Sequence, residues 1–331
     1  MNVDAWLFVA LGLVWGTNFL FMKEAVQVVS PLQVAWLRAS FGALPIVVFA
    51  LSRRSLAKAD LRHVHHFAAM SVLSTVVPYV GFVKGTQLLQ SGAAGAISGV
   101  IPLMTALFAA LFLPSDRLSA RKALGLVLGV AGVACVADVT RLLEASSRDA
   151  LHGTWLMLLG SAGYASGMVY ARRFVTPLKL SPLALAGYQT AGAAALLTLI
   201  TPLRGVEALG HAPRALAAVA LGLGLVGTGI AFILYYRIIE RLGAITASSV
   251  FYVPPVVALL VGALVGHEGL SASQCLGTAV ILLGVFLARN GAPVEVQKSR
   301  AGDLPRGDGI EADPVRLHEL EDGLARRGPH V

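Results

Sequence analysis

Long runs of apolar residues, separated by short polar segments, follow one another from the N-terminus to about residue 289. Most runs are near 20 residues long, which is about what a helix needs to cross the hydrocarbon core of a bilayer. The pattern therefore predicts an all-α polytopic membrane protein whose consecutive helices are antiparallel neighbours. The ten predicted transmembrane helices cover residues 5–23, 32–51, 67–88, 93–113, 121–139, 153–171, 181–203, 215–236, 244–265 and 272–289.

The second half of this pattern repeats the first. Segment 102–132 aligns without a gap with segment 254–284, at an offset of 152 residues. A self-match at a fixed offset indicates internal duplication. Each copy holds five predicted helices, and this odd number makes the second copy enter the membrane from the opposite side. The sequence therefore predicts two inverted five-helix repeats, at 1–142 and 150–289, and such repeats recur in transporters.

Composition supports the membrane interpretation and indicates an orientation. The chain is 56% hydrophobic and 13% charged, whereas soluble domains carry about twice that charged fraction. Twelve Lys and Arg residues fall in one set of loops and five in the alternate set. The positive-inside rule places the richer loops and both termini in the cytoplasm, in a cell inner membrane. The polar tail, 290–331, is predicted to be disordered and cytoplasmic.

Residues that break helices fall within the third and fourth predicted helices of both copies. Broken helices at matching positions point to a substrate cavity, because unwound backbone is tolerated in a membrane only where protein or a cavity covers it. A simple kink is the alternative at any single position. The predicted helix-breaking or gating residues are Pro78, Pro102, Gly227, Gly229, Pro254 and Pro255.

Polar and aromatic residues near these breaks are candidates to line such a cavity. Aromatic faces can hold an apolar group or an ammonium, and amides and hydroxyls can fix polar groups. The alternative roles are hydrogen bonds between helices and an aromatic belt at the membrane surface. We expect the belt role most for Tyr235, near a helix end. The candidate substrate-binding residues are Trp15, Asn18, Thr75, Tyr79, Tyr164, Gln189, Thr228 and Tyr252.

Two basic residues, Arg38 and Lys84, lie within predicted helices. A charge inside the membrane is a functional hypothesis by default, here an electropositive site for a substrate carboxylate or phosphate. The alternative is that both side chains extend to the membrane surface. Asp116 and Glu268 lie at matching places in short connections. We expect these two acids to cap the helix that follows each of them in the chain.

Other chemistries receive little support. The glycine motif at 222–227 lies inside an apolar run with no preceding strand, so it does not predict a dinucleotide loop. His63, His65 and His66 lack cysteine or carboxylate partners at a suitable spacing, so we expect no metal. We also expect no cofactor, no nucleic-acid partner and no enzyme activity. A lipid-linked membrane enzyme would need an acid, base or metal cluster at the interface, and a non-transporting scaffold or receptor stays an alternative.

Several short motifs occur in a characteristic order along residues 5–289. They are Trp15-Gly16-Thr17-Asn18-Phe19, Leu37-Arg38, Pro102, the carboxylates of Asp116 and Glu268, and the glycines Gly125 and Gly132. In this order the chain resembles the drug/metabolite transporter superfamily, in particular its EamA-type ten-helix transporters. The second copy departs from the pattern, with Tyr164-Ala165 in place of the Trp-Gly pair and Gln189 near the position of Arg38.

The resemblance implies a secondary active transporter in a lipid bilayer. Such transporters commonly export amino acids, related metabolites or drugs, and the resemblance does not fix the substrate of this chain. It also implies proton coupling, although the sequence shows no acid in the middle of a predicted helix. Uptake or exchange of an anionic solute is the alternative within transport. Pairs of small residues four apart leave a homodimer open.

Overall fold

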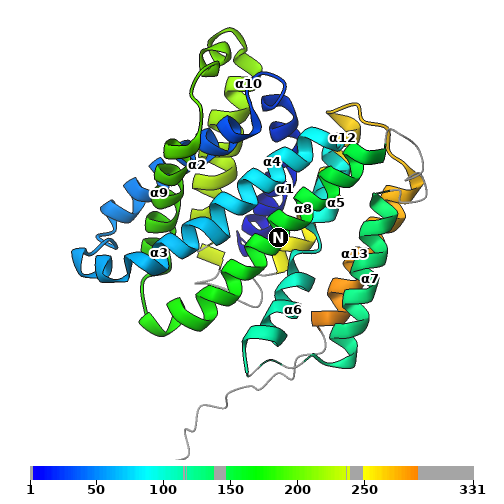
Figure 1. Ribbon diagram of the computed structural model, residues 1–331, viewed down its shortest axis with the longest axis horizontal. Helices are drawn as coiled ribbons and strands as arrows, with labels where there is room; N and C mark the ends of the chain where they lie inside the picture. Colours follow the sequence, from blue (N-terminus) through cyan, green and yellow to red (C-terminus); the bar gives the residue numbers. More distant parts are fainter. Residues whose placement is uncertain are drawn as a thin grey trace, which may run out of the picture. The chain divides into compact units, whose positions relative to one another are not determined.

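The computed structural model describes residues 3–114, 116, 118–137, 147–235, 237–238 and 249–289 (Figure 1). All secondary structure in these ranges is helical, which confirms the predicted fold class. The predicted tail, 290–331, lies outside the described residues, and the repeat boundaries stay a prediction. The α-helices are α1 (Val3–Ala25), α2 (Pro31–Ser52), α3 (Val64–Ser71), α4 (Val77–Leu88), α5 (Ser91–Ser98), α6 (Ile101–Phe112), α7 (Ala120–Val136), α8 (Ser147–Tyr170), α9 (Pro182–Ile200), α10 (Pro213–Ala217), α12 (Val253–Leu264) and α13 (Ala272–Arg289).

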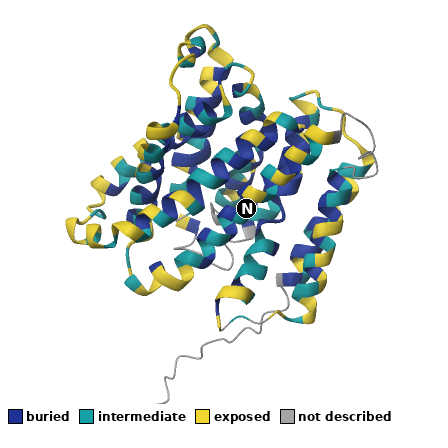
Figure 2. Cartoon of the chain, viewed as in Figure 1, coloured by how far each residue is buried: buried dark blue, intermediate teal, exposed yellow. Residues whose placement is uncertain are grey.

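The outer surface of these helices is apolar enough for a lipid environment. Within the described residues, six helical segments are long and apolar enough to cross a membrane, and the apolar helices at 250–264 and 272–288 are shorter. Exposed residues recur along several helices (Figure 2), and many of them are large and apolar; Leu199, for example, is 82% exposed. In water such a surface would be unfavourable, whereas lipid tails solvate it. The chain is a polytopic membrane protein. The six segments are 6–25, 31–52, 58–88, 91–112, 182–200 and 213–235.

Helices α7 and α13 pack side by side through glycines (Figure 1). A Cβ placed on Gly125 would lie 2.5 Å from the carbonyl oxygen of Gly284, and one on Gly132 would lie 2.7 Å from that of Gly277. The contacts are reciprocal, because a Cβ on Gly277 would meet the oxygen of Gly132 at 2.6 Å. Residue numbers rise along α7 as they fall along α13, so the two helices are antiparallel. They are corresponding helices of the two copies, so the copies are inverted.

Three further pairs of helix contacts follow the same two-fold relationship. Helix α1 packs on α12, and its counterpart α8 packs on α6. Likewise α8 packs on α4, and α1 packs on the π-helix η7 (Ala218–Ile230). Helix α2 packs on η7, as α9 packs on α3. Exchanging the two halves therefore turns one contact of each of these three pairs into the other.

Regular α-helix is interrupted within the third and fourth predicted helices of each half. The π-helix η2 (Val72–Val76) separates α3 from α4, and Pro78 lies in the first turn of α4. Helices α5 and α6 are separated at Gly99 and Val100, with Pro102 in the first turn of α6. In the second half, η7 contains Gly227 and Gly229, and the 3₁₀ turn η8 (Ser249–Tyr252) precedes α12. Prolines fit these first turns because the missing N–H has no partner there in any case.

The two carboxylates of the short connections do not act as we expected. Helix α7 is capped by the hydroxyl of Ser119, and α13 by that of Ser271, which accepts from the amide of Gln274 at 3.1 Å. The carboxylate of Glu268 instead accepts from the first amides of α5, which is distant in sequence. Asp116 forms an ion pair with Arg172. The expectation that each acid caps the next helix is therefore wrong, because serine hydroxyls already occupy those positions.

We predict that Gly132→Leu strongly destabilises the protein. The new side chain would collide with the backbone of α13, and forcing extra methylenes into a packed core costs about 1–3 kcal/mol or more. The midpoint of thermal unfolding, followed by size-exclusion chromatography in detergent, should fall. Val130→Leu is the matched control, because Val130 lies on the same helix and is 70% exposed. Equal midpoints for the two variants would contradict the close packing.

Candidate functional site

A cavity of about 180 Å³ lies between the two halves of the chain. Helices from both halves line it, including α1, α2, α4 and α5 from the first and α8, α9 and α12 from the second. Most of its lining is apolar or aromatic and a few polar groups converge on it, which is typical of small-molecule sites. The lining residues are Trp15, Asn18, Phe19, Met22, Arg38, Ser74, Phe82, Ser98, Ile101, Tyr164, Met168, Gln189, Phe232, Tyr235, Phe251 and Pro254.

Helix α1 contributes one continuous stripe to the cavity wall. Its lining residues Trp15, Asn18, Phe19 and Met22 recur at intervals of three and four, so they share a helix face. Gly16 lies on another face, where a Cβ would be 2.4 Å from the side chain of Val257 on α12. The absence of a side chain at this glycine lets α12 approach closely, which brings both helices to the cavity.

Aromatic rings form two groups in the cavity wall. Trp15 stacks on Phe251, with ring centroids 5.1 Å apart, and its centroid is 5.5 Å from that of Tyr235. Phe82 lies with its centroid 5.7 Å from that of Tyr164. Tyr235 therefore belongs to the cavity wall and not to a belt at the membrane surface, because it packs against Trp15. Rigid rings of this kind offer flat apolar surfaces to a solute.

Arg38 is the buried cation of this cavity, and its side chain is 5% exposed. Its Nε donates to Oγ1 of Thr228 at 3.2 Å, and its guanidinium carbon lies 4.0 Å from the centroid of the Tyr79 ring. Thr228 is itself fixed, because its hydroxyl donates to the carbonyl oxygen of Leu223 at 2.9 Å. Nη1 of Arg38 is buried and has no hydrogen-bond partner among the described residues. The guanidinium is thus held from one side and retains free donor capacity.

Asn18 supplies a free acceptor in the same cavity. Its Nδ2 lies 3.4 Å from the carbonyl oxygen of Gly227, which fixes the orientation of the amide. Its Oδ1 is buried and also unpaired within the described part of the chain. A Cβ on Gly227 would lie 2.2 Å from this oxygen, so only glycine leaves room for Asn18 here. Buried polar atoms are nearly always paired, so an unpaired donor and an unpaired acceptor on two residues that line one cavity indicate a polar ligand or water.

Gln189 is positioned by two hydrogen bonds, one from its side chain and one to its backbone carbonyl. Its Nε2 donates to Oγ1 of Thr75 at 3.0 Å, and its carbonyl oxygen accepts from the hydroxyl of Ser71 at 2.9 Å. Thr75 is fully buried behind the cavity wall. These contacts join α9 to the last residue of α3 and to the π-helix η2, at one of the helix breaks.

The structure sorts the candidate substrate-binding residues into three groups. Five line the cavity, namely Trp15, Asn18, Arg38, Tyr164 and Gln189. Thr75, Tyr79 and Thr228 are buried directly behind it and hold lining residues. Lys84 is exposed and does not line the cavity, and Tyr252 packs on the neighbouring core.

The helix-breaking residues have different neighbours. Pro254 lines the cavity, Gly227 contacts Asn18, and Gly229 packs on Pro45. Sequence reasoning missed most apolar lining residues and two serines. In the sequence, these residues are marked only by lying on the same helix face as a polar candidate. Ordinary packing residues lie on such faces too, so this position does not identify a lining residue. The missed residues are Phe19, Met22, Ser74, Phe82, Ser98, Ile101, Met168, Phe232 and Phe251.

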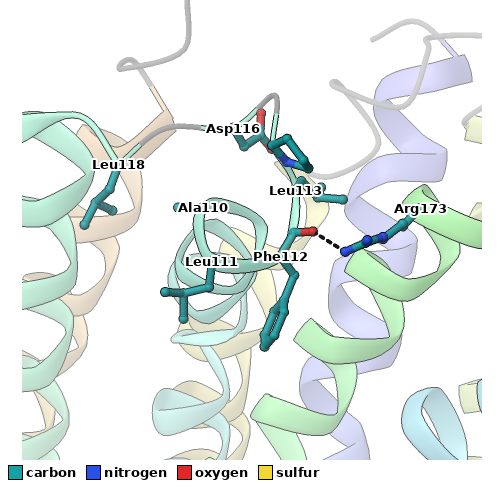
Figure 3. Close-up of a pocket in the computed structure, with 8 residues that line it drawn as sticks. Ala110, Leu111, Phe112, Leu113, Asp116, Leu118 and Arg173 are labelled. Atoms are coloured by element: carbon teal, nitrogen blue, oxygen red, sulfur yellow. Dashed lines mark hydrogen bonds between the residues drawn. The ribbon is translucent and has the colours of Figure 1, made fainter.

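A second, open hollow of about 520 Å³ lies at the end of α6 (Figure 3). Asp116 and Ala110 line it, and Arg173 reaches into it to donate to the carbonyl oxygen of Phe112 at 2.7 Å. Its side chains come from one helix end, one connection and Arg173. The central cavity, where both halves meet and free polar groups converge, is the better candidate for a solute site.

Comparison with known proteins agrees with this architecture. The EamA-like transporter family matches residues 4–137 and again residues 151–289. The chain is 28% identical to the uncharacterized inner membrane transporter YedA of Escherichia coli K12 over 295 residues, covering 85% of this chain and 89% of YedA. It is 23% identical to the uncharacterized transporter YoaV of Bacillus subtilis, covering 84% of this chain and 94% of YoaV.

A solved crystal structure shares the fold, with a TM-score of 0.57 at 21% sequence identity. The alignment covers 86% of this chain and 96% of that one. The family matches extend over both halves of the chain, and the two halves of the structure are inverted copies of one another. The chain belongs to the EamA-like transporter family.

Proposed function

We propose that this chain is a secondary active transporter that carries a small amphipathic solute through the central cavity by alternating access. The cavity lies between two inverted halves, and rocking of such halves about a fixed site is a common transport mechanism. The relatives YedA and YoaV are named as transporters without a stated substrate. We further propose the cell inner membrane as its location, with both termini in the cytoplasm.

The free buried donor on Arg38 is the observation that carries the proposal. A cation with an unpaired nitrogen in a low-dielectric cavity favours an anionic group on the solute, and a carboxylate fits a guanidinium well. The free Oδ1 of Asn18 would accept from an ammonium or hydroxyl of the same solute. The aromatic rings around Trp15 would cover an apolar portion. Amino acids and related metabolites combine these features, and export is the direction we propose for them.

The free donor also favours a second candidate function. A solute with only a phosphate or carboxylate could use Arg38 without needing Asn18, and it would be taken up or exchanged as an anion. The two candidates differ in the need for a hydrogen-bond donor on the solute. Amino acids should therefore depend on both side chains, whereas simple anions should depend on Arg38 alone.

We predict that Arg38→Met abolishes most transport of carboxylate-bearing solutes in proteoliposome counterflow. Losing charge-assisted hydrogen bonds costs about 1.5–3 kcal/mol, which corresponds to roughly a tenfold to hundredfold weaker apparent affinity. Transport of an amide-capped analogue should change little. Lys84→Met is the matched control and should leave transport unchanged, since Lys84 is exposed outside the cavity.

Two results would contradict the proposal. Equal losses in Arg38→Met and Lys84→Met would show that the buried guanidinium has no special role. Absence of counterflow for every solute in a broad panel of amino acids, organic acids and cationic drugs would contradict the transport function itself.

The proposed orientation has its own test. In a variant with Cys135→Ala and Cys275→Ala, Ser55→Cys places a single thiol in the connection after α2. We expect no reaction with an impermeant thiol reagent added outside intact cells, and reaction once the membrane is permeabilised. Labelling in intact cells would place this connection outside and reverse the assignment.

A further inference from the structure

The turn that joins α4 to α5 is held by two side chains of opposite charge. On one side is Lys23, at the end of α1. Its Nζ donates to the carbonyl oxygens of Thr86 and Gln87 at 3.2 Å each and to that of Leu89 at 2.6 Å. Thr86 and Gln87 belong to the last turn of α4 and Leu89 follows its end, where a cation is favoured because the carbonyls have no helical partner.

Glu268 holds the other side of the same turn. Its two carboxylate oxygens accept from the amides of Ser91 at 2.7 Å and Gly92 at 3.0 Å, which are the first amides of α5. Gly262 on α12 leaves room for this carboxylate, since a Cβ there would lie 2.6 Å from Oε2. An anion is favoured at a helix N-terminus because the first N–H groups have no helical partner and carry partial positive charge. Together Lys23 and Glu268 form a clamp around the turn, hereafter the Lys23–Glu268 clamp.

The Lys23–Glu268 clamp lies directly beyond one end of the central cavity. Met22 lines the cavity and immediately precedes Lys23, and its sulfur lies 3.9 Å from the hydroxyl oxygen of Thr86. Phe82 lines the cavity one helical turn before Thr86. The clamp joins α1, α4 and α5 to the connection after α12. Helices α1, α4, α5 and α12 each contribute residues to the cavity wall. By joining the ends of these helices, the clamp stabilises their packing at this end of the cavity.

The other half of the chain contains charges of the same sign at the equivalent positions. The alignment that places Trp15 over Tyr164 also places Lys23 over Arg172, and the 152-residue offset places Glu268 over Asp116. In the described structure Arg172 pairs with Asp116, and the turn of the second half that corresponds to the α4–α5 turn, within 239–248, lies outside the described residues. Asp116 lines the open hollow at the end of α6 (Figure 3).

The equivalent side chains Arg172 and Asp116 thus show that charges at these positions can pair directly with each other. At one end they are separated by a clamped turn, and at the other they are joined to each other beside an open hollow. In alternating access, each end of an inverted repeat passes between an open and a closed state.

We propose that the Lys23–Glu268 clamp is the latch of a gate at this end of the cavity. It is engaged in the present state, and it releases the α4–α5 turn when this end opens. The two released side chains then pair with each other, as Arg172 and Asp116 do. Because the released charges gain a partner, the two states stay close in free energy, as a switch requires. The proposal rests on the alternating-access function proposed above.

Thiol accessibility inside the cavity tests the latch without requiring transport. Ser98→Cys places a reporter in the cavity wall of the cysteine-free variant, and Gln87→Cys, at the exposed turn, identifies from which side the impermeant reagent reaches the clamp. We expect Glu268→Gln and Lys23→Met each to raise the labelling rate of the Ser98→Cys reporter from that side by about tenfold, since each loses charge-assisted hydrogen bonds. Glu24→Gln and Lys84→Met are the matched controls and should leave the rate unchanged.

Gly262→Ala provides a second route that retains both charges. Its methyl group would displace the carboxylate of Glu268, so it should raise the labelling rate in the same direction. Size-exclusion chromatography identifies any variant that fails to fold, and such a variant is excluded from the comparison. Labelling rates of folded Glu268→Gln and Gly262→Ala that equal those of the controls would overturn the latch. A failed transport assay would not change these rates, so the two proposals fail separately.

Discussion

Hydrocarbon offers no hydrogen bonds, so every break in a membrane helix must be satisfied within the protein. This chain interrupts its helices at corresponding places in both halves, and each interruption is next to the other half. The carbonyl oxygen of Gly227 is met by Asn18, and the prolines at the starts of α4, α6 and α12 need no amide partner. The same interruptions separate the helices enough to leave a cavity. The requirement for backbone pairing therefore places the cavity where the two halves meet.

Duplication explains how this arrangement is held together. Lipid tails are as apolar as the helix surfaces, so helices in a bilayer associate by close packing. The glycines of α7 and α13 bring two backbones into contact at a crossing that is identical when the halves are exchanged. This crossing relates the halves by a two-fold axis and leaves other helices, α1, α2, α4, α5, α6, α8, α9 and α12, to line the cavity. One part of each half thus joins the repeats, and the other part provides the walls.

Much of this architecture could be predicted from the sequence, because its signals are one-dimensional. Apolar runs and the 152-residue offset gave the helices and the inverted duplication, and Trp15, Asn18 and Arg38 could be selected as polar or aromatic residues in apolar surroundings. Lys84 has the same signal as Arg38, and only its position on the exposed face of α4 separates them. The role of Glu268 was missed because its partners, Ser91 and Gly92, lie 177 and 176 residues away. A contact between residues of the two halves leaves no local sequence pattern from which both partners could be identified.

The most direct test of the account is whether a carboxylate-bearing solute binds beside Trp15 and Arg38. Trp15 is one of four tryptophans, and replacing Trp6, Trp36 and Trp155 by Phe leaves it as the single tryptophan, in the cavity wall. Titrating this variant with a panel of amino acids and organic acids should change the Trp15 emission for those that bind. The change should disappear for an amide-capped analogue of a binding solute and in the Arg38→Met background. Emission that responds equally to the acid and its amide, or that responds in the same way without Arg38, would contradict the assignment of the cavity as a carboxylate-binding transport site.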